Sequence, residues 1–180
     1  MIQNAVRVLL VDDESGILDT LKILFKGEGY HVQVASSGRE AIEALDGDRP
    51  DLVLTDIRMP GASGLEVLAK AREVDPELPV ILMTAQASLQ SAVRAVNEGA
   101  YYYLQKPFAN DELLAICRRA VEARQLRREN KALKKEIRRR ERSVEDRPIG
   151  RSRAFLEVLK LAETVAPTES TILISGAVSY

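Results

Sequence analysis

Five side chains that could do chemistry stand at the ends of short apolar runs. They are three carboxylates, one hydroxyl and one ammonium group, on Asp12, Asp13, Asp56, Thr84 and Lys106. Clustered carboxylates repel one another and destabilise a fold unless a cation binds among them. Oxygen ligands of this kind suit Mg²⁺, which uses few protein carboxylates and completes its shell with water and phosphate oxygens. If the fold brings these groups together, they predict magnesium-assisted phosphoryl transfer.

Asp56 is the predicted nucleophile of such a site. A carboxylate that attacks phosphorus forms an acyl phosphate, and Mg²⁺ with the Lys106 ammonium would stabilise the charge on the transferring group. The Thr84 hydroxyl could donate to a phosphoryl oxygen. Each residue alone is weak evidence, because an Asp after a strand is more often a helix cap and a Lys-Pro pair is more often a turn. Five such residues at matching positions favour the chemical interpretation.

Alternating strand and helix patterns can position these residues. Short apolar or β-branched runs predict strands at Val8–Val11, His31–Ala35, Leu52–Leu54, Val80–Met83 and Tyr101–Leu104. Helical apolar faces lie between them, within residues 17–25, 41–45, 65–71 and 92–96, the last formed by Ala92, Val93 and Val96. This order predicts an α/β fold, a doubly wound (βα)5 parallel sheet with helices on both faces. Chemistry in such a sheet lies beyond the carboxyl ends of the strands, where the five residues stand.

Four motifs resemble the receiver domain of two-component response regulators. They read Val-Asp12-Asp13-Glu14, Thr-Asp56-Ile-Arg-Met-Pro60-Gly, Met-Thr84-Ala and Lys106-Pro107-Phe. The resemblance covers residues 5–122 and implies the strand order 2-1-3-4-5, a topology known from this family. It also implies that Asp56 accepts a phosphoryl group from a histidine kinase. Its implied Mg²⁺ ligands are Asp12, Asp13, Asp56 and the backbone carbonyl of Arg58.

The resemblance also implies a conformational switch made of Thr84, Lys106 and the aromatic Tyr103. Strand alternation places Tyr101 and Tyr103 on one face of the last strand and Tyr102 on the other. Tyr102 either adds apolar area alone or contributes to a dimer face, and we favour the first interpretation. The family resemblance nevertheless makes the last strand and helix of the receiver a candidate surface for homodimers.

Charge divides the chain into three parts. The 180 residues have a net charge of −1, but residues 1–117 hold 10 basic and 18 acidic side chains, whereas residues 118–142 hold 12 basic and 4 acidic ones. So abrupt a change indicates a boundary. We therefore expect an acidic receiver, a basic helical linker at residues 123–142 and a third piece at residues 147–180.

Heptad spacing in the basic segment predicts a parallel coiled coil. Its dimerisation seam is Ala123, Leu126, Asn130, Leu133 and Ile137, in which a polar Asn at a core position favours two strands in fixed register. The clear seam covers only about two heptads, which is short for an independent coil. A lone solvated helix is the alternative, and a DNA-binding stripe ranks last because the basic run overlaps the seam instead of preceding it.

The third piece resembles the start of the AAA+ ATPase domain of sigma-54-dependent, NtrC-like activators. The segments Pro148-Ile-Gly150-Arg-Ser152 and Val165 to Gly176 carry this resemblance, with one helix at Arg153–Val165 and one strand at Thr171–Ile174. In that family Gly176 would open the phosphate loop, but its lysine and Mg²⁺-binding hydroxyl are absent here. We expect a truncated domain without ATPase activity, in which Ala177–Tyr180 are foreign to the family.

Composition excludes several other function classes. A single cysteine, Cys117, excludes a disulfide framework, and a single histidine, His31, excludes multi-histidine metal sites. No apolar run approaches a membrane span and no signal peptide is evident, so we expect a cytoplasmic protein that does not bind membranes. No helix-turn-helix pattern follows the basic linker, so we expect no specific DNA binding.

The expected function is a phosphorylation-controlled response regulator, which controls dimer assembly and, in the full-length family, sigma-54-dependent transcription. An aspartate-based phosphatase would need a second aspartate two residues after Asp56, where this chain has Arg58. Slow self-dephosphorylation is therefore expected rather than enzymatic turnover. A dimeric scaffold that no longer signals is the alternative, and the intact candidate site argues against it.

Overall fold

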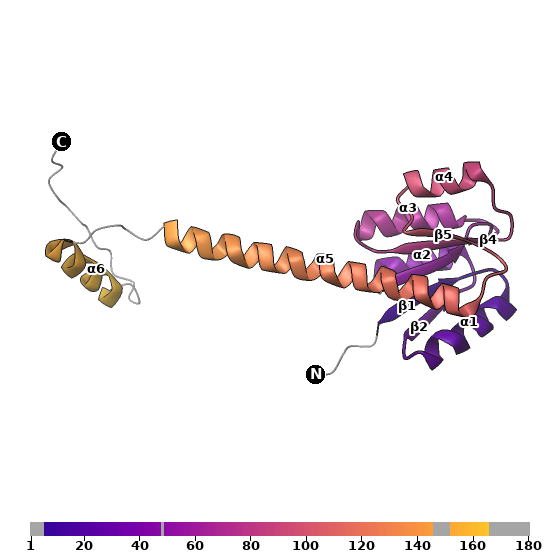
Figure 1. The fold of residues 1–180 in the computed structure, drawn as a ribbon, viewed down its shortest axis with the longest axis horizontal. Coiled ribbons are helices and arrows are strands. Elements are labelled where there is room, and N and C mark those ends of the chain that lie inside the picture. The colour runs from indigo at the N-terminus through magenta and orange to yellow at the C-terminus, as the bar shows by residue number, and fades with distance from the viewer. Residues whose placement is uncertain (1–5, 48, 146–151, 166–180) are drawn as a thin grey trace. The chain divides into compact units, whose positions relative to one another are not determined.

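The computed structural model describes residues 6–47, 49–145 and 152–165 and contains one five-stranded parallel sheet (Figure 1). The strands lie in the order β2-β1-β3-β4-β5, and every neighbouring pair is parallel. They are β1 (Arg7–Val11), β2 (His31–Ala35), β3 (Leu52–Asp56), β4 (Val80–Thr84) and β5 (Tyr102–Gln105). The predicted strands, fold class and strand order are confirmed, with strand ends that differ by one or two residues.

Helices alternate with the strands and cover both faces of the sheet. They are α1 (Ser15–Gly27), α2 (Gly38–Gly47), α3 (Gly64–Val74), α4 (Leu89–Asn97), α5 (Asn110–Glu145) and, further along the chain, α6 (Arg153–Val165). The predicted helix at residues 153–165 is confirmed. The predicted strand at 171–174 and the residues from Gly176 onward lie outside the described residues.

The core consists of two apolar layers, one on each face of the sheet. Phe25 of α1 and Leu113 and Ile116 of α5 belong to the layer on one face, and Leu45 of α2 and Leu68 of α3 belong to the other. Every residue of β3 and β4 is buried, as expected for central strands covered by helices on both sides. Cys117 lies in the first layer, where burial raises the pKa of its thiol to about 12.

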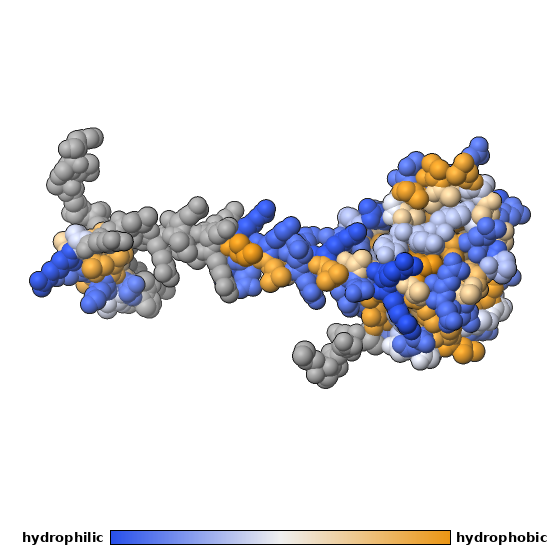
Figure 2. Space-filling model, in the orientation of Figure 1, coloured by the Kyte–Doolittle hydropathy of each residue, from blue (hydrophilic) through white to orange (hydrophobic). Residues whose placement is uncertain are grey.

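Helix α4 differs from the sequence prediction. Its buried residue is Ala95, whereas Val93 and Val96 of the predicted apolar face are 49% and 66% exposed, and Leu89 is 82% exposed. The apolar surface over α4 is visible in Figure 2. The prediction failed because the most apolar side of α4 was assumed to be its buried side, whereas the small Ala95 makes the close contact with the sheet.

Helix α5 continues well beyond the receiver core. Its buried apolar residues end at Val121, and apolar side chains farther along it are exposed among charged ones (Figure 2). By contacts, the chain forms two compact units, residues 1–131 and 132–180. No helix in the described ranges is both long and apolar enough to span a membrane.

A candidate phosphoryl-acceptor site

Lys106 connects two buried carboxylates at the carboxyl edge of the sheet. Its Nζ atom lies 2.7 Å from Asp12 Oδ2 and 2.7 Å from Asp56 Oδ1. Asp12 follows β1, Asp56 ends β3 and Lys106 follows β5, so three strands that are distant in sequence supply the cluster. Three of the five predicted residues are therefore in direct contact.

The two carboxylates hold the lysine in its charged form. Burial alone would lower the pKa of Lys106, but hydrogen bonds and charge attraction from Asp12 and Asp56 outweigh it and raise this pKa above its ordinary value. A raised lysine pKa contributes stability that is complete below the unfolded value, near 10.4, and is lost as the pH rises through the folded value. Lys106 therefore remains an ammonium group at neutral pH.

Backbone N–H groups fix the orientation of both carboxylates. The Glu14 N–H donates to Asp12 Oδ1 at 3.0 Å, and the Arg58 N–H donates to Asp56 Oδ2 at 2.6 Å. Asp12 is fully buried, and Asp56 is 7% exposed. Each of the four oxygens thus has one donor, which leaves further lone pairs able to accept another donor or a cation.

Asp13 is the third predicted carboxylate and directly follows Asp12 in the chain. It is exposed, and no donor to its carboxylate occurs among the residues that the structure describes. Asp12, Asp13 and Asp56 with Lys106 have a net charge of −2, which matches a divalent cation, and oxygen ligands suit Mg²⁺. The described part of the chain contains no group of three Asp, Glu, His or Cys side chains that is placed to hold a metal ion. The chemistry of the donors nevertheless fits Mg²⁺.

Thr84 lies beside this cluster but is bonded to its own loop. Its hydroxyl is buried at the end of β4, where it donates to the Gln86 carbonyl at 3.3 Å and accepts from the Gln86 N–H at 3.2 Å. The Lys106 N–H donates to the Thr84 carbonyl at 2.7 Å, which joins the ends of β4 and β5. The hydroxyl would have to leave Gln86 to reach a group on Asp56.

Tyr103 is connected to the first turn of α4. Its side chain is half-buried, and its hydroxyl oxygen lies 2.8 Å from Ser91 Oγ. Ser91 and Ser88 also cap α4 reciprocally. The sequence signal for Ser91 was weak, because this type of capping box usually has Glu or Gln at its fourth position.

Gly64 supports the Asp56 backbone and was missed by the sequence analysis. A Cβ atom at Gly64 would lie 2.1 Å from the Asp56 carbonyl oxygen, far inside contact distance, and the Gly64 N–H donates to the Ile57 carbonyl at 3.0 Å. A capping box between Ser63 and Glu66 fixes the start of α3 at this point. The only available signal was a glycine inside the Ser63-x-x-Glu66 cap, which does not reveal the close approach to Asp56.

The model of the response regulator receiver domain family matches residues 8–118, which include all five candidate residues. The chain belongs to this family. The matched region ends within α5, close to where the buried core contacts of this helix end.

Relatives extend the similarity beyond the receiver. The alginate biosynthesis transcriptional regulatory protein AlgB of Pseudomonas aeruginosa is 39% identical over 170 residues, which cover 94% of this chain and 37% of AlgB. The regulatory protein AtoC of Escherichia coli K12 is 35% identical over 175 residues, which cover 94% of this chain and 36% of AtoC. The chain thus spans little more than a third of the length of these relatives.

Solved structures show the same two levels of similarity. A CheY-like response regulator receiver protein from Methanospirillum hungatei matches with a TM-score of 0.67 at 32% sequence identity. The match covers 69% of this chain and 99% of the Methanospirillum chain. NtrX from Brucella abortus, solved in complex with ADP, has a TM-score of 0.67 at 32% identity and covers 93% of this chain and 35% of its own. The first similarity is to a receiver alone, and the second continues into the residues that follow it.

Substituting Gly64 by Ala should damage the site through the main chain. The added Cβ must displace the Asp56 carbonyl, and overpacking of this kind typically costs about 1–3 kcal/mol. We expect Gly64→Ala to lower the free energy of unfolding in urea by this amount and to slow phosphorylation by acetyl phosphate. Gly47→Ala is the matched control, because nothing lies within 4 Å of its added Cβ. Equal stability and phosphorylation of the two variants would contradict the role given to Gly64.

Proposed function

We propose that this chain is the signal-receiving part of a two-component regulator and that Asp56 accepts a phosphoryl group from a histidine kinase. The observation that supports this best is the Lys106 bridge between Asp12 and Asp56 at adjacent strand ends. It brings a buried nucleophile, a fixed ammonium group and a second carboxylate into one cluster. Ordinary structural roles do not require an ion triad at this edge of the sheet.

The residues would divide the chemistry of transfer among them. An Asp56 oxygen attacks phosphorus, the phosphorus–nitrogen bond to the kinase imidazole breaks, and the imidazole leaves with the electron pair. The residues proposed to hold Mg²⁺ are Asp12, Asp13, Asp56 and the Arg58 carbonyl. Bound there, the ion would neutralise charge on the transferring phosphoryl oxygens. Lys106 remains within reach to pair with one of those oxygens.

The proposed switch follows from the new charge on Asp56. Thr84 would exchange its bonds to Gln86 for a bond to a phosphoryl oxygen, and Tyr103 would give up Ser91. Both changes involve the β4–α4 connection or the first turn of α4, next to the exposed apolar surface of that helix. Phosphorylation can shift this equilibrium only by its preference for one state.

We further propose that the chain is a phosphoacceptor rather than a turnover enzyme. An aspartate-based phosphatase would place an acidic group at position 58, but Arg58 stands there with an exposed side chain. The acyl phosphate would then be lost slowly by reaction with water.

We propose that the chain consists of a receiver at residues 5–122, a linker at residues 123–142 and the start of an AAA+ domain at residues 147–180. We also propose that α5 mediates homodimerisation through its exposed seam. Leu126, Leu133 and Ile137 are 59%, 60% and 54% exposed, which is unusual for three large apolar residues at heptad spacing. A second copy of the helix would bury them, with Ala123 and Asn130 completing the seam. The receiver surface formed by β5 and α5 would contribute a second contact.

In the whole protein, phosphorylation would control sigma-54-dependent transcription, as the similarity to named transcriptional regulators suggests. Specific DNA binding is not assigned to this chain. Its basic linker would attract polyanions only weakly and in a salt-dependent way.

Phosphorylation of Asp56 is tested most simply by mass. Acetyl phosphate with Mg²⁺ should add one phosphoryl group to the wild-type chain and none to Asp56→Asn, because the amide is a poor nucleophile. Asp19→Asn, at an exposed position of α1, is the control and should be labelled normally. Labelling of Asp56→Asn, or of another site in the wild type, would refute the assignment.

Dimerisation is tested by removing two seam residues together. A Leu→Ala change at a buried position typically costs about 2–5 kcal/mol of stability. At these two positions the loss of dimer stability should lie at the low end of this range, because the seam of a coiled coil retains some exposure. Sedimentation should therefore show wild-type dimers and monomers for the double variant Leu126→Ala, Leu133→Ala. Ile23→Ala, which removes an apolar group 74% exposed on α1, should leave the dimer unchanged. A dimer that survives the double variant would place the interface on the receiver alone.

A further inference from the structure

Arg124 is a buried charge on the part of α5 that follows the receiver core. Only 4% of the residue is exposed, although its neighbours in the sequence include many solvated basic side chains. Its Nη1 atom donates to the Pro50 carbonyl at 3.1 Å and the Asp51 carbonyl at 3.0 Å, and its Nη2 atom donates to Asp75 Oδ2 at 2.7 Å. One guanidinium therefore holds two separate loops.

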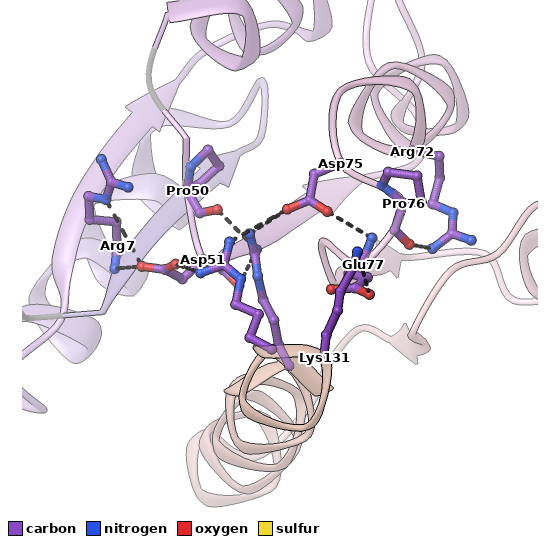
Figure 3. A network of polar contacts seen from close by, with 10 residues as sticks. Arg7, Pro50, Asp51, Arg72, Asp75, Pro76, Glu77 and Lys131 are labelled. Atoms are coloured by element: carbon purple, nitrogen blue, oxygen red, sulfur yellow. Dashed lines mark hydrogen bonds and ion pairs between the residues drawn. The ribbon is translucent and has the colours of Figure 1, made fainter. Parts of the chain in front are cut away.

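Two more basic residues on the same side of α5 extend this contact. Arg128 lies 3.6 Å from both Asp51 and Asp75, and Lys131 lies 3.6 Å from Glu77. Figure 3 shows Asp51, Asp75 and Glu77 facing the helix, with Lys131 directed toward Glu77. We call Arg124, Arg128 and Lys131 the ionic clamp.

The clamp buries a charged guanidinium group, and this burial costs free energy. Burial, and then the neighbouring Arg128 guanidinium, lower the pKa of Arg124 below its ordinary value. The Arg124 Nε atom is buried without a hydrogen-bond partner among the described residues. Buried ion pairs are often no more stabilising than apolar packing, but they specify one arrangement of the groups they join.

The loops held by the clamp lead into the two central strands. Pro50 and Asp51 precede β3, which ends at Asp56, and residues 75–77 precede β4, which ends at Thr84. The clamp thus holds α5 at the amino edge of the sheet, where Asp51 lies roughly 16 Å along the strand direction from Asp56.

The clamp and the dimerisation seam lie on opposite sides of α5. Helical rotation of about 100° per residue places Leu126 and Leu133 about 180–200° from Arg124, while Arg128 and Lys131 lie within about 40° of it. With the clamp closed, Leu126 must point away from the receiver core, and its 59% exposure agrees with this arrangement.

We propose that Arg124 is the positioning residue that fixes the rotation of α5 about its own axis on the receiver. This rotation turns the seam toward a second copy of the chain and transmits structural changes at the acceptor site to the seam. The first part, fixed rotation, stands on the contacts alone. The second part, transmission to the seam, rests on the proposed function.

Hydrogen exchange of the full chain without phosphorylation tests the fixed rotation. Arg124→Met keeps the chain length and apolar stem of the side chain but removes the charged bonds. Loss of such bonds should increase amide exchange in residues 122–131 by at least about tenfold, while β3 and β4 remain protected. The comparison is made in the Leu126→Ala, Leu133→Ala background, so that dimerisation cannot supply the protection.

Arg138→Met is the matched control, because Arg138 is exposed and occupies the same heptad position two heptads later. It should leave exchange in residues 122–131 unchanged. Asp75→Asn, which removes the partner charge, gives a second variant in case Arg124→Met does not fold, and it should show the same local effect. Unchanged exchange in the folded clamp variants would overturn the fixed rotation.

Transmission from the acceptor site to the seam is tested by comparing the dimer affinity with and without beryllofluoride and Mg²⁺. The wild type and Arg138→Met should change affinity on addition of this phosphoryl mimic, whereas Arg124→Met, in the native seam background, should change by less than about twofold. Acetyl phosphate should still label Arg124→Met at the wild-type rate, which separates loss of transmission from loss of the acceptor. An undiminished response of Arg124→Met would overturn transmission, and failed labelling of the wild type would instead refute the proposed function.

Discussion

The fold depends on neutralising two buried carboxylates at neighbouring strand ends. Asp12 and Asp56 are placed side by side because β1 and β3 are adjacent and parallel, and neither side chain can reach bulk water freely. Among the residues that the structure describes, only Lys106, which follows β5 on the far side of β4, lies 2.7 Å from both. A second cation or a phosphoryl group entering this cluster must rearrange its charges, so chemistry and conformation are coupled here by electrostatics.

The opposite, amino edge of the sheet also holds a cluster of opposite charges. There the loops supply Asp51 and Asp75, and α5 supplies Arg124 and Arg128. β3 and β4 run between the two edges and are buried throughout, so they are stiff connections rather than flexible ones. The acidic domain and the basic helix that follows it thus partly neutralise each other where α5 contacts these loops.

Local patterns were sufficient to predict the strands and the meeting of Asp12, Asp56 and Lys106 at one edge of the sheet, because apolar runs and the residues after them are adjacent in sequence. Features that depend on distant partners were not predictable. Arg124 was one of 12 basic residues in a run that suggested a solvated face, and its partners lie 49 to 74 positions away. Gly64 gave no sign of its close approach to Asp56, and α4 buries the small Ala95 rather than its most apolar face.

The central claim, that one acidic cluster takes a divalent cation beside Asp56, is tested most directly by NMR during a Mg²⁺ titration. The Glu14 and Arg58 amides report on it, because they donate to Asp12 and Asp56 respectively. The account predicts that both signals shift together and saturate at one ion per chain, and that Asp13→Asn weakens this binding. Signals that do not move, or that move independently of one another, would contradict it.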